Sequence, residues 1–324
     1  MFVAFIASGD GSFHTLDSIA AVREAHARPD ARVWIDLEAP DEPELLAPRD
    51  LFHLDDEALD DCIHGEPWPR IDDFDTHIFL VLYGLFGLKE VGEVEPHKLA
   101  IFCGPRFLVT IHRQPLLTVR QVKAHCGRHP EVLIGRGVDA VLCALIDAMV
   151  ANYLRVADRY EERLDALEER SFRPDVDAGL LPELADLRRD LIQLRRLATA
   201  QRELLRPLMT GEYDFISEAL SQRFQHVRDH LSQVIEAVNG MREVMSGVYQ
   251  NYHSALAGRT NEIMKVLTIY AGILLPLTVI AGIYGMNLPL WPAPESPWSF
   301  WVVMGIMIGI TLLMYMQFRR RKWL

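Results

Sequence analysis

Cysteine, basic residues and nucleotide-binding motifs are all scarce in this chain. Its four cysteines include no CxxC pair, which argues against a disulfide framework and for a reducing compartment. Lys and Arg total 33 against 45 Asp and Glu, so we expect no nucleic-acid partner. No P-loop, dinucleotide fingerprint or nucleophile elbow occurs, so we expect no cofactor, no enzymatic activity and no pumping by ATP. The first residues, MFVAFIAS, lack a basic region and are expected to form a strand rather than a signal peptide.

Charge is also absent from two long stretches near the C-terminal end. Residues 266–294 and 296–318 contain no Asp, Glu, Lys or Arg, and only Glu295 separates them. Each stretch is longer than the roughly 20 residues that cross a hydrocarbon core about 30 Å thick. Two such stretches in tandem predict a pair of membrane spans, with membrane lipids as partners.

The flanking residues predict how these spans are oriented. Arg319, Arg320, Arg321 and Lys322 follow the second stretch, whereas the loop between the stretches has no basic residue. By the positive-inside rule the C-terminus faces the cytoplasm. Two spans return the chain to its starting side, so we expect both termini to be cytoplasmic in a protein of the cell (inner) membrane.

In the rest of the chain the pattern of apolar residues changes near residue 136, from one typical of strands and short helices to one typical of long helices. Before it, β-branched runs at 2–8, 32–39, 77–86, 97–104 and 106–113 alternate with acidic helical segments at 42–48 and 55–65, which predicts an α/β domain with a mixed sheet. After it, helical periodicity predicts helices over 138–171, 182–209 and 215–283. The expected organisation is an α/β domain (1–136), a helical hairpin (137–214), a stalk helix (215–265), a first span (266–284), an outer loop (285–297), a second span (298–318) and a basic tail (319–324).

Small and polar residues recur on one face of the third helix. Steps of three and four separate Gln250, Ser254, Ala257, Asn261, Met264, Thr268, Ala271, Leu275, Thr278 and Gly282. Such a stripe either lets membrane helices pack closely or lines a conduit. Two spans cannot enclose a conduit, so transport would require several copies of the chain around an axis, with each position forming a ring. Met264, Leu267 or Leu275 would then form apolar constrictions.

The first apolar stretch ends on Tyr284, Gly285, Met286 and Asn287, which would lie at the outer mouth of such a conduit. Gly285 allows the helix to end there, and Asn287 offers a neutral carbonyl oxygen. Neutral oxygens suit a cation that keeps its water, and Mg²⁺ is the cation that loses water most reluctantly. The pattern therefore favours hydrated Mg²⁺ as the transported ion.

The stretch TNEIMKVLTIYAGILLPLTVIAGIYGMN, residues 260–287, resembles the pore helix of the CorA family of magnesium and cobalt channels, and the basic KWL ending is similar too. The resemblance implies a funnel-shaped homopentamer whose first spans line the pore. It implies that Gly285, Met286 and Asn287 form the entrance filter and that Asn261 forms a second polar ring. By the same resemblance Met264 and Leu267 form the constriction, Thr278 and Gly282 line the upper pore, and residues 319–322 form a basic collar, with simple membrane anchoring as the alternative.

The resemblance also implies feedback closure by intracellular Mg²⁺ bound between neighbouring subunits. The corresponding stalk position falls on His226, which lies four residues from His230 and close to Asp229. This spacing suits Zn²⁺ or Co²⁺, or belongs to a solvated face. Acidic clusters at residues 54–61 and 72–75 offer carboxylates to Mg²⁺, or are likewise solvated surface.

Three functions remain open on the sequence. The first is a channel for hydrated Mg²⁺, also passing Co²⁺ and Ni²⁺, driven by the membrane potential. The second is a Zn²⁺ transporter of the related zinc branch, with proton coupling. The third is a membrane-anchored helical scaffold that conducts nothing.

Overall fold

The computed structural model describes residues 2–64, 68–86, 95–173, 178–286, 291–292, 298–321 and 323. The chain forms two compact units: the first comprises Met1–Arg170 and Asp177–Val248, and the second comprises Ser171–Val176 and Tyr249–Leu324. The elements are β1 (Phe2–Ala7), β2 (Phe13–Leu16), α1 (Ile19–His26), β3 (Arg32–Glu38), α2 (Glu42–Phe52), α3 (Asp56–His64), β4 (Arg70–Phe74), β5 (His77–Phe86), β6 (Glu95–Cys103), β7 (Phe107–His112), α4 (Leu117–Arg128), η1 (Pro130–Val132), α5 (Val138–Ser171), α6 (Leu180–Leu204), α7 (Arg206–Met209), α8 (Glu218–Tyr284) and α9 (Ser299–Arg320).

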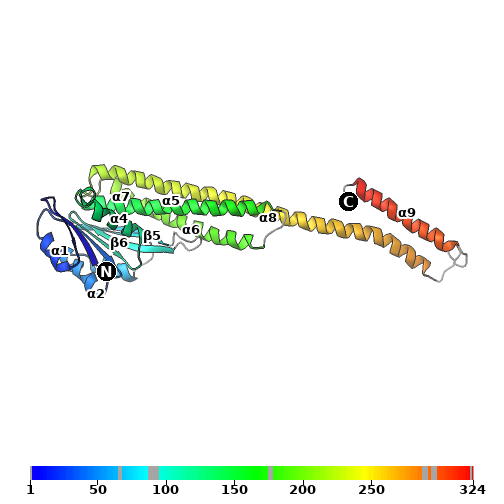
Figure 1. The fold of residues 1–324 in the computed structure, drawn as a ribbon, viewed down its shortest axis with the longest axis horizontal. Helices are drawn as coiled ribbons and strands as arrows, with labels where there is room; N and C mark the ends of the chain where they lie inside the picture. The colour runs from blue at the N-terminus through cyan, green and yellow to red at the C-terminus, as the bar shows by residue number, and fades with distance from the viewer. Residues whose placement is uncertain are drawn as a thin grey trace. The chain divides into compact units, whose positions relative to one another are not determined.

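A mixed sheet of seven strands, in the order β2-β1-β3-β7-β6-β5-β4, organises the first unit (Figure 1). Only the β3–β7 pair is parallel. Phe52 of α2 stacks on Phe107 of β7 on one face of the sheet, and Lys123 of α4 reaches Asp36 of β3 on the other. Helices therefore cover both faces, and the α/β fold with a mixed sheet is confirmed.

The five predicted strands are present as β1, β3, β5, β6 and β7, but two strands were missed. β2 and β4 are short and stand at the two edges of the sheet. Their sequences, FHTL and RIDDF, lack the apolar alternation that marks a strand with a buried face. Polar residues on short edge strands discourage pairing with other chains, and they also hide such strands from a pattern search.

The predicted helices are found with small differences. α5 occupies residues 138–171 as expected, whereas the helix expected over 182–209 is divided into α6 and α7. Pro207 lies in the first turn of α7, where its missing N–H needs no partner, so the chain starts a new helix there. α8 is one continuous helix of 67 residues that passes through Pro276 and contributes to both units.

A buried polar network joins the centre of the sheet to α4. The Asp36 carboxylate is fully buried and accepts a hydrogen bond from the Thr110 hydroxyl at 2.6 Å and from the Lys123 ammonium at 2.6 Å. His112 Nε2 lies 3.2 Å from the same carboxylate. Burial raises the pKa of Asp36, but the His112 and Lys123 contacts outweigh it and hold the pKa below its ordinary value.

A second buried histidine lies in an aromatic pocket on the opposite face. His77 is 2% exposed and stacks on Phe74, with Phe102 and Phe107 also within 6.0 Å between ring centroids. Its Nδ1 lies 3.0 Å from the Thr76 hydroxyl, and within the described chain its Nε2 has no partner. Burial lowers the pKa of His77, partly offset by the charge of Asp55, so the folded protein favours the neutral ring.

Replacing Asp36 by Leu should lower the free energy of unfolding by roughly 3–5 kcal/mol, because it leaves the Lys123 ammonium, 16% exposed, without its counter-charge. Thermal unfolding of the purified protein in detergent would measure this loss. The double variant Asp36→Leu/Lys123→Met removes both charges and should recover most of the stability. Equal stability of the single and double variants would contradict a paired charge at this place.

The protein should lose thermal stability as the pH falls below neutrality. The unfolded chain binds the His77 proton at the ordinary histidine pKa of about 6.5, whereas the folded chain binds it only at a lower pH, so stability is complete above that window and declines through it. His77→Phe keeps an aromatic ring at this position but removes the group that titrates. The decline in melting temperature between about pH 7.5 and 5 should therefore be smaller in the variant. His26 and His97, whose pKa values burial also lowers, contribute to the slope in the same direction. Identical slopes in wild type and variant would refute this role.

Candidate functional site

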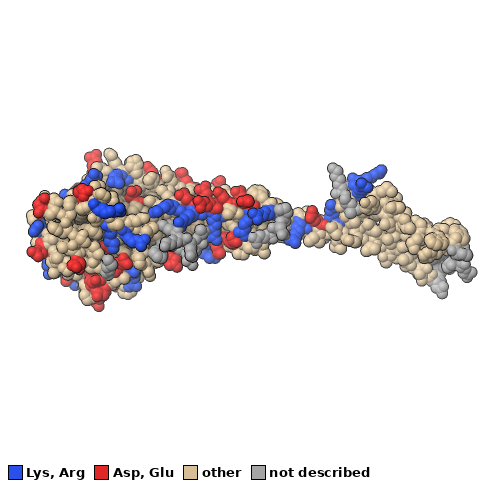
Figure 2. Space-filling model, in the orientation of Figure 1, with Lys and Arg blue, Asp and Glu red and all other residues tan. Residues whose placement is uncertain are grey.

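Three helices within the described ranges are long and apolar enough to cross a membrane: α5, α8 and α9. In α5, 67% of the apolar segment is buried inside the protein, against 0% in α8 and 6% in α9. Figure 2 shows an uncharged surface over the exposed apolar segments of the second unit, in contrast to the mixed charges of the first. The apolar face of α5 therefore serves the protein core, and α8 and α9 are the transmembrane helices.

One face of α8 packs toward α9. A side chain at Gly272 would place its first carbon 3.0 Å from Phe318 and 3.6 Å from Met314, both on α9. Neighbouring positions on this face are half-buried: Ile269, Ile273, Pro276, Leu277 and Ile280. Gly272 thus lets the two helices approach closely.

An α-helix turns by about 100° per residue, so the positions of the predicted stripe lie on the face of α8 that points away from α9. Every stripe position from Gln250 to Gly282 is exposed in the single chain. The apolar members are prominent, with Met264 54% and Leu275 67% exposed, and the adjacent Leu267 is 60% exposed. The helix hairpin of one chain therefore leaves this face uncovered.

The same pattern extends far below the predicted stripe. Steps of three and four lead back from Gln250 to Gly247, Glu243, Gly240, Glu236, Gln233, Asp229 and His226, and forward from Gly282 to Gly285. All of these are exposed except Gly247, which is half-buried. We call the whole set, from His226 to Gly285, the open seam. In the first unit it faces away from the buried side of α8, which carries Phe224, Val227, Leu231, Val234, Val238, Met241, Met245 and Val248.

Charge on the open seam is confined to its lower part. Asp229, Glu236 and Glu243 follow one another at seven-residue intervals, a rise of about 10 Å each, and no ion pair engages them in the described chain. From Gly247 to Gly285 the seam has no charge. Glu236 and Glu243 were not predicted from the sequence, because acidic residues on a helix usually mark a solvated face; the unbroken spacing of three and four was the available signal.

Two threonines give the membrane part of the seam its polar groups. The Thr268 hydroxyl donates to the Met264 carbonyl at 2.7 Å, and the Thr278 hydroxyl donates to the Leu274 carbonyl at 2.9 Å. Because each hydroxyl hydrogen is used within the helix, its oxygen remains able to accept a hydrogen bond from outside. The seam therefore offers acceptor oxygens, which suit water bound to a cation.

The predicted filter lies at the end of α8. The Gly285 N–H donates to the Ala281 carbonyl at 2.9 Å, and the Met286 N–H donates to the Ile283 carbonyl at 3.1 Å. Asn287 lies outside the described residues. Tyr284 is half-buried on the face away from the seam, and its hydroxyl donates to the Trp291 carbonyl at 2.8 Å. This hydrogen bond ties Tyr284 to Trp291 in the segment between α8 and α9.

The basic end of the chain begins within the last turn of α9, which contains Arg319 and Arg320 and is followed by Arg321. Arg319, Arg320 and Arg321 are exposed, whereas Lys322 lies outside the described residues. The Trp323 N–H donates to the Phe318 carbonyl at 3.0 Å, and the two rings stack. Phe318 is the residue that packs on Gly272, so the tail is held against the α8–α9 contact.

The predicted regulatory metal residues do not form a complete site within one chain. No group of three His, Cys, Asp or Glu side chains suited to a metal ion occurs in the described part of the chain, which includes His226, Asp229 and His230. His226 and Asp229 belong to the open seam, while His230 beside them is half-buried. A metal bound there would need ligands from a second copy of the chain.

The acidic clusters at residues 54–61 and 72–75 are partly engaged by arginines. Arg70 pairs with Asp61 and, at 2.7 Å, with Asp72. Arg49 pairs with Asp56 at 3.1 Å. These contacts favour a surface role for the clusters over a free ligand set for Mg²⁺.

Comparison with known proteins connects this geometry to one family. The model of the CorA-like Mg²⁺ transporter proteins matches residues 30–320. YfjQ of Bacillus subtilis is 31% identical over 90% of this chain and 89% of its own length. The cobalt/magnesium transport protein CorA of Thermotoga maritima is 29% identical over 85% of this chain and 78% of its own. The complete structure of the CorA magnesium transporter from Methanocaldococcus jannaschii has the same fold, with a TM-score of 0.86 at 22% identity and 99% coverage of both chains.

A lower similarity extends to zinc transporters. The zinc transport protein ZntB of Photorhabdus laumondii is 23% identical over 67% of this chain and 68% of its own.

Replacing Gly272 by Val should destabilise the α8–α9 hairpin by roughly 1–3 kcal/mol, because the added carbon meets Phe318 at 3.0 Å. The measurement is the melting temperature in detergent. Gly282→Val is the matched control, since no atom lies within 4 Å of the carbon added at that position, on the open seam. Equal losses in the two variants would show that helix propensity, rather than this contact, decides the effect.

Proposed function

This chain belongs to the CorA-like family of Mg²⁺ transporter proteins, and from this premise we propose that it is a homopentameric channel through which hydrated Mg²⁺ enters the cell. It is a membrane protein of a family that transports divalent metal ions rather than catalysing reactions. Co²⁺ and Ni²⁺, of similar charge and hydration, would follow the same route. We place it in the inner membrane with both termini in the cytoplasm, because residues 319–322 are basic and the outer loop has no basic residue.

The observation that supports this proposal most is the open seam. A single α8–α9 hairpin leaves a polar, small-residue face of a membrane helix uncovered, and such a face is costly against lipid. Copies of α8 arranged around an axis would turn this face inward, and every seam position would become a ring. Five copies is the number implied by the resemblance to the family.

The chemistry of these rings suits a hydrated cation. Asn287 and the backbone of Gly285 and Met286 would form the outer filter, with Thr278 and Gly282 below it. Asn261 would provide a second amide ring at the inner end of the membrane. Neutral oxygens hydrogen-bond the waters of Mg²⁺ without replacing them, which matches the reluctance of this ion to dehydrate.

Met264 and Leu267 would form the constriction between the polar rings. Both side chains are more than half exposed in the single chain, at 54% and 60%, so they are available to meet around an axis. An apolar ring closes a conduit by expelling water from it. Thr268, Ala271 and Leu275 would line the wider part above.

The electrostatics favour entry of cations. An inside-negative potential contributes roughly 2.3 kcal/mol per charge per 100 mV, so about 4.6 kcal/mol for a divalent ion. Below the membrane, rings of Glu243, Glu236 and Asp229 would attract the ion toward the cytoplasm. The exposed arginines at residues 319–321 would anchor the inner membrane surface or form a collar around the pore.

We also propose feedback closure by intracellular Mg²⁺ held between subunits. His226 and Asp229 lie on the open seam, with His230 beside them, so a neighbouring copy could supply the missing ligands. Carboxylates rather than imidazoles suit Mg²⁺, which makes Asp229 and Glu236 the stronger candidates.

Uptake of Mg²⁺ into proteoliposomes tests the channel. Entry should follow an imposed membrane potential and be independent of a proton gradient. Asn287→Ala should reduce it at least tenfold, because the outer amide ring is lost. Asn251→Ala is the matched control: it removes the same group from a half-buried position of α8 outside the seam and should leave uptake unchanged.

Two other results of the uptake experiment would support a different function. Similarity to ZntB makes Zn²⁺ the second candidate, so proton-dependent Zn²⁺ entry with little Mg²⁺ flux would assign the protein to the zinc branch. Absence of flux for both ions in wild type would instead support a scaffold that conducts nothing.

A further inference from the structure

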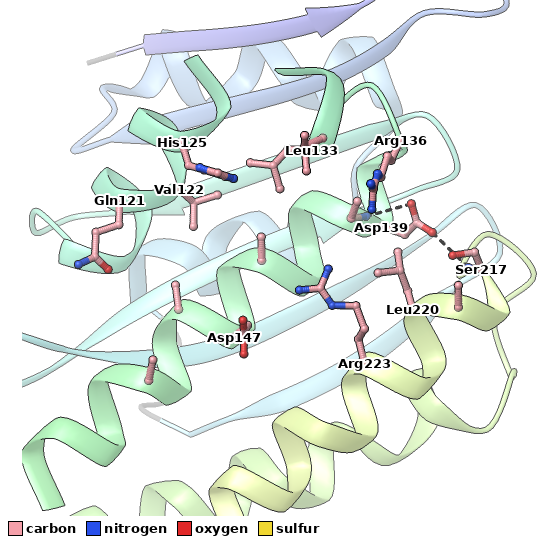
Figure 3. Close-up of a pocket in the computed structure, with 16 residues that line it drawn as sticks. Gln121, Val122, His125, Leu133, Arg136, Asp139, Asp147, Ser217, Leu220 and Arg223 are labelled. Carbon is pink, nitrogen blue, oxygen red and sulfur yellow. Dashed lines mark hydrogen bonds between the residues drawn. The ribbon is translucent and has the colours of Figure 1, made fainter. Parts of the chain in front are cut away.

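A hollow of about 580 Å³ lies in the first unit, more than forty residues along α8 from the start of its membrane segment at residue 266 (Figure 3). It is bounded by α4, by the segment that leads into α5 and by the first turns of α8. This volume falls within the range of small-molecule sites, about 300–1,000 Å³. The transport function uses none of its residues.

The floor of the hollow is made of alanines. Ala140, Ala144, Ala148 and Ala151 follow one face of α5, and Ala219 of α8 adjoins them. Methyl groups leave space that larger side chains would fill, and they present a smooth apolar surface. Val122, Leu133 and Leu220 form apolar walls around it (Figure 3).

Two arginines from different elements point into this space (Figure 3). Arg136 comes from the segment before α5, and Arg223 comes from the second turn of α8. Both are exposed, and neither makes an ion pair or a side-chain hydrogen bond within the described residues. Two guanidinium groups without an ion-pair partner, next to an apolar floor, are suited to an anionic ligand.

Asp139 also lines the hollow, but in the described residues its carboxylate makes no ion pair with either arginine. Asp139 accepts hydrogen bonds from the backbone N–H of Ala140 at 3.0 Å and of Ser217 at 3.1 Å, and it is 8% exposed. Gly137 makes this possible, because a side chain there would collide with the Asp139 carboxylate at 2.0 Å. The N-terminal turns of α5 and α8 therefore compensate the charge of Asp139. Asp147 remains as the one unengaged acid against Arg136 and Arg223 among the described lining residues.

We propose that this hollow binds a phosphate-bearing small molecule with a flat apolar body, of the class of nucleoside phosphates. The phosphate oxygens pair with the planar guanidinium groups of Arg136 and Arg223, which match them in geometry. The flat body lies on the alanine floor between Val122 and Leu220. His125 and Gln121 at the rim supply hydrogen bonds to the polar edge of that body.

Isothermal titration calorimetry on the full chain in detergent tests the site, with adenosine and guanosine monophosphates as probes and without added Mg²⁺. One nucleotide should bind per chain. Adenosine alone and inorganic phosphate alone should each bind at least tenfold more weakly, since each lacks one half of the recognised structure. Phosphate binding as tightly as the nucleotides would overturn the role of the alanine floor.

Substitutions distinguish nucleotide binding in this hollow from unspecific attraction of the nucleotide to arginines. Arg136→Ala and Arg223→Ala should each weaken nucleotide binding at least tenfold, whereas Arg242→Ala, an exposed arginine elsewhere on α8, should not. Ala151→Leu at the exposed edge of the floor should also abolish binding without altering the melting temperature. Absence of nucleotide binding to wild type, or equal loss with Arg242→Ala, would refute the proposal.

Discussion

The structure depends on one constraint: α8 packs one face against the rest of the chain in two places, between Phe224 and Val248 and again beside α9, and leaves the opposite face uncovered. In the first unit the buried face carries residues such as Phe224, Leu231 and Val238, which belong to the apolar core of that unit. In the second unit Gly272 brings the helix against α9. A single chain therefore covers part of one side of α8 with its own residues. The other side is available only to neighbours, lipid or water.

Much of this architecture follows from patterns that are local in the sequence. The central strand β5 is an almost continuous apolar run, β3 is apolar in its interior except for Asp36, and the steps of three and four that mark α5 predict its bounds directly. The membrane helices are evident from missing charge. The edge strand β4 was not predicted, because it carries Asp72 and Asp73 and acidic residues are typical of a loop. Mean hydropathy alone does not separate α5 from a membrane helix; its charged residues and the burial of its apolar segment do.

The two surfaces to which we assign a function could be predicted from the sequence to different degrees. The upper seam stands out because Asn261, Thr268 and Thr278 are polar residues in an apolar helix. Its lower half is concealed, since Glu236 and Glu243 resemble any solvated helix surface. The hollow beside α4 could not be predicted at all. Its alanines are ordinary helix formers, and Arg136 and Arg223 are 87 positions apart, so only the fold brings them to one place.

The spacing of the open seam also has a consequence for assembly. Its repeat of seven residues is slightly shorter than two turns of a straight α-helix, so the seam drifts by about 20° in each repeat. Between His226 and Gly285 this drift accumulates to roughly 170°, and a bundle of straight parallel helices would turn the acidic end away from the axis that the outer glycine faces. In the proposed assembly the copies of α8 would have to wind around one another in a left-handed supercoil to keep the seam on a single line. A change in that winding would then rotate the two ends of the proposed pathway relative to each other.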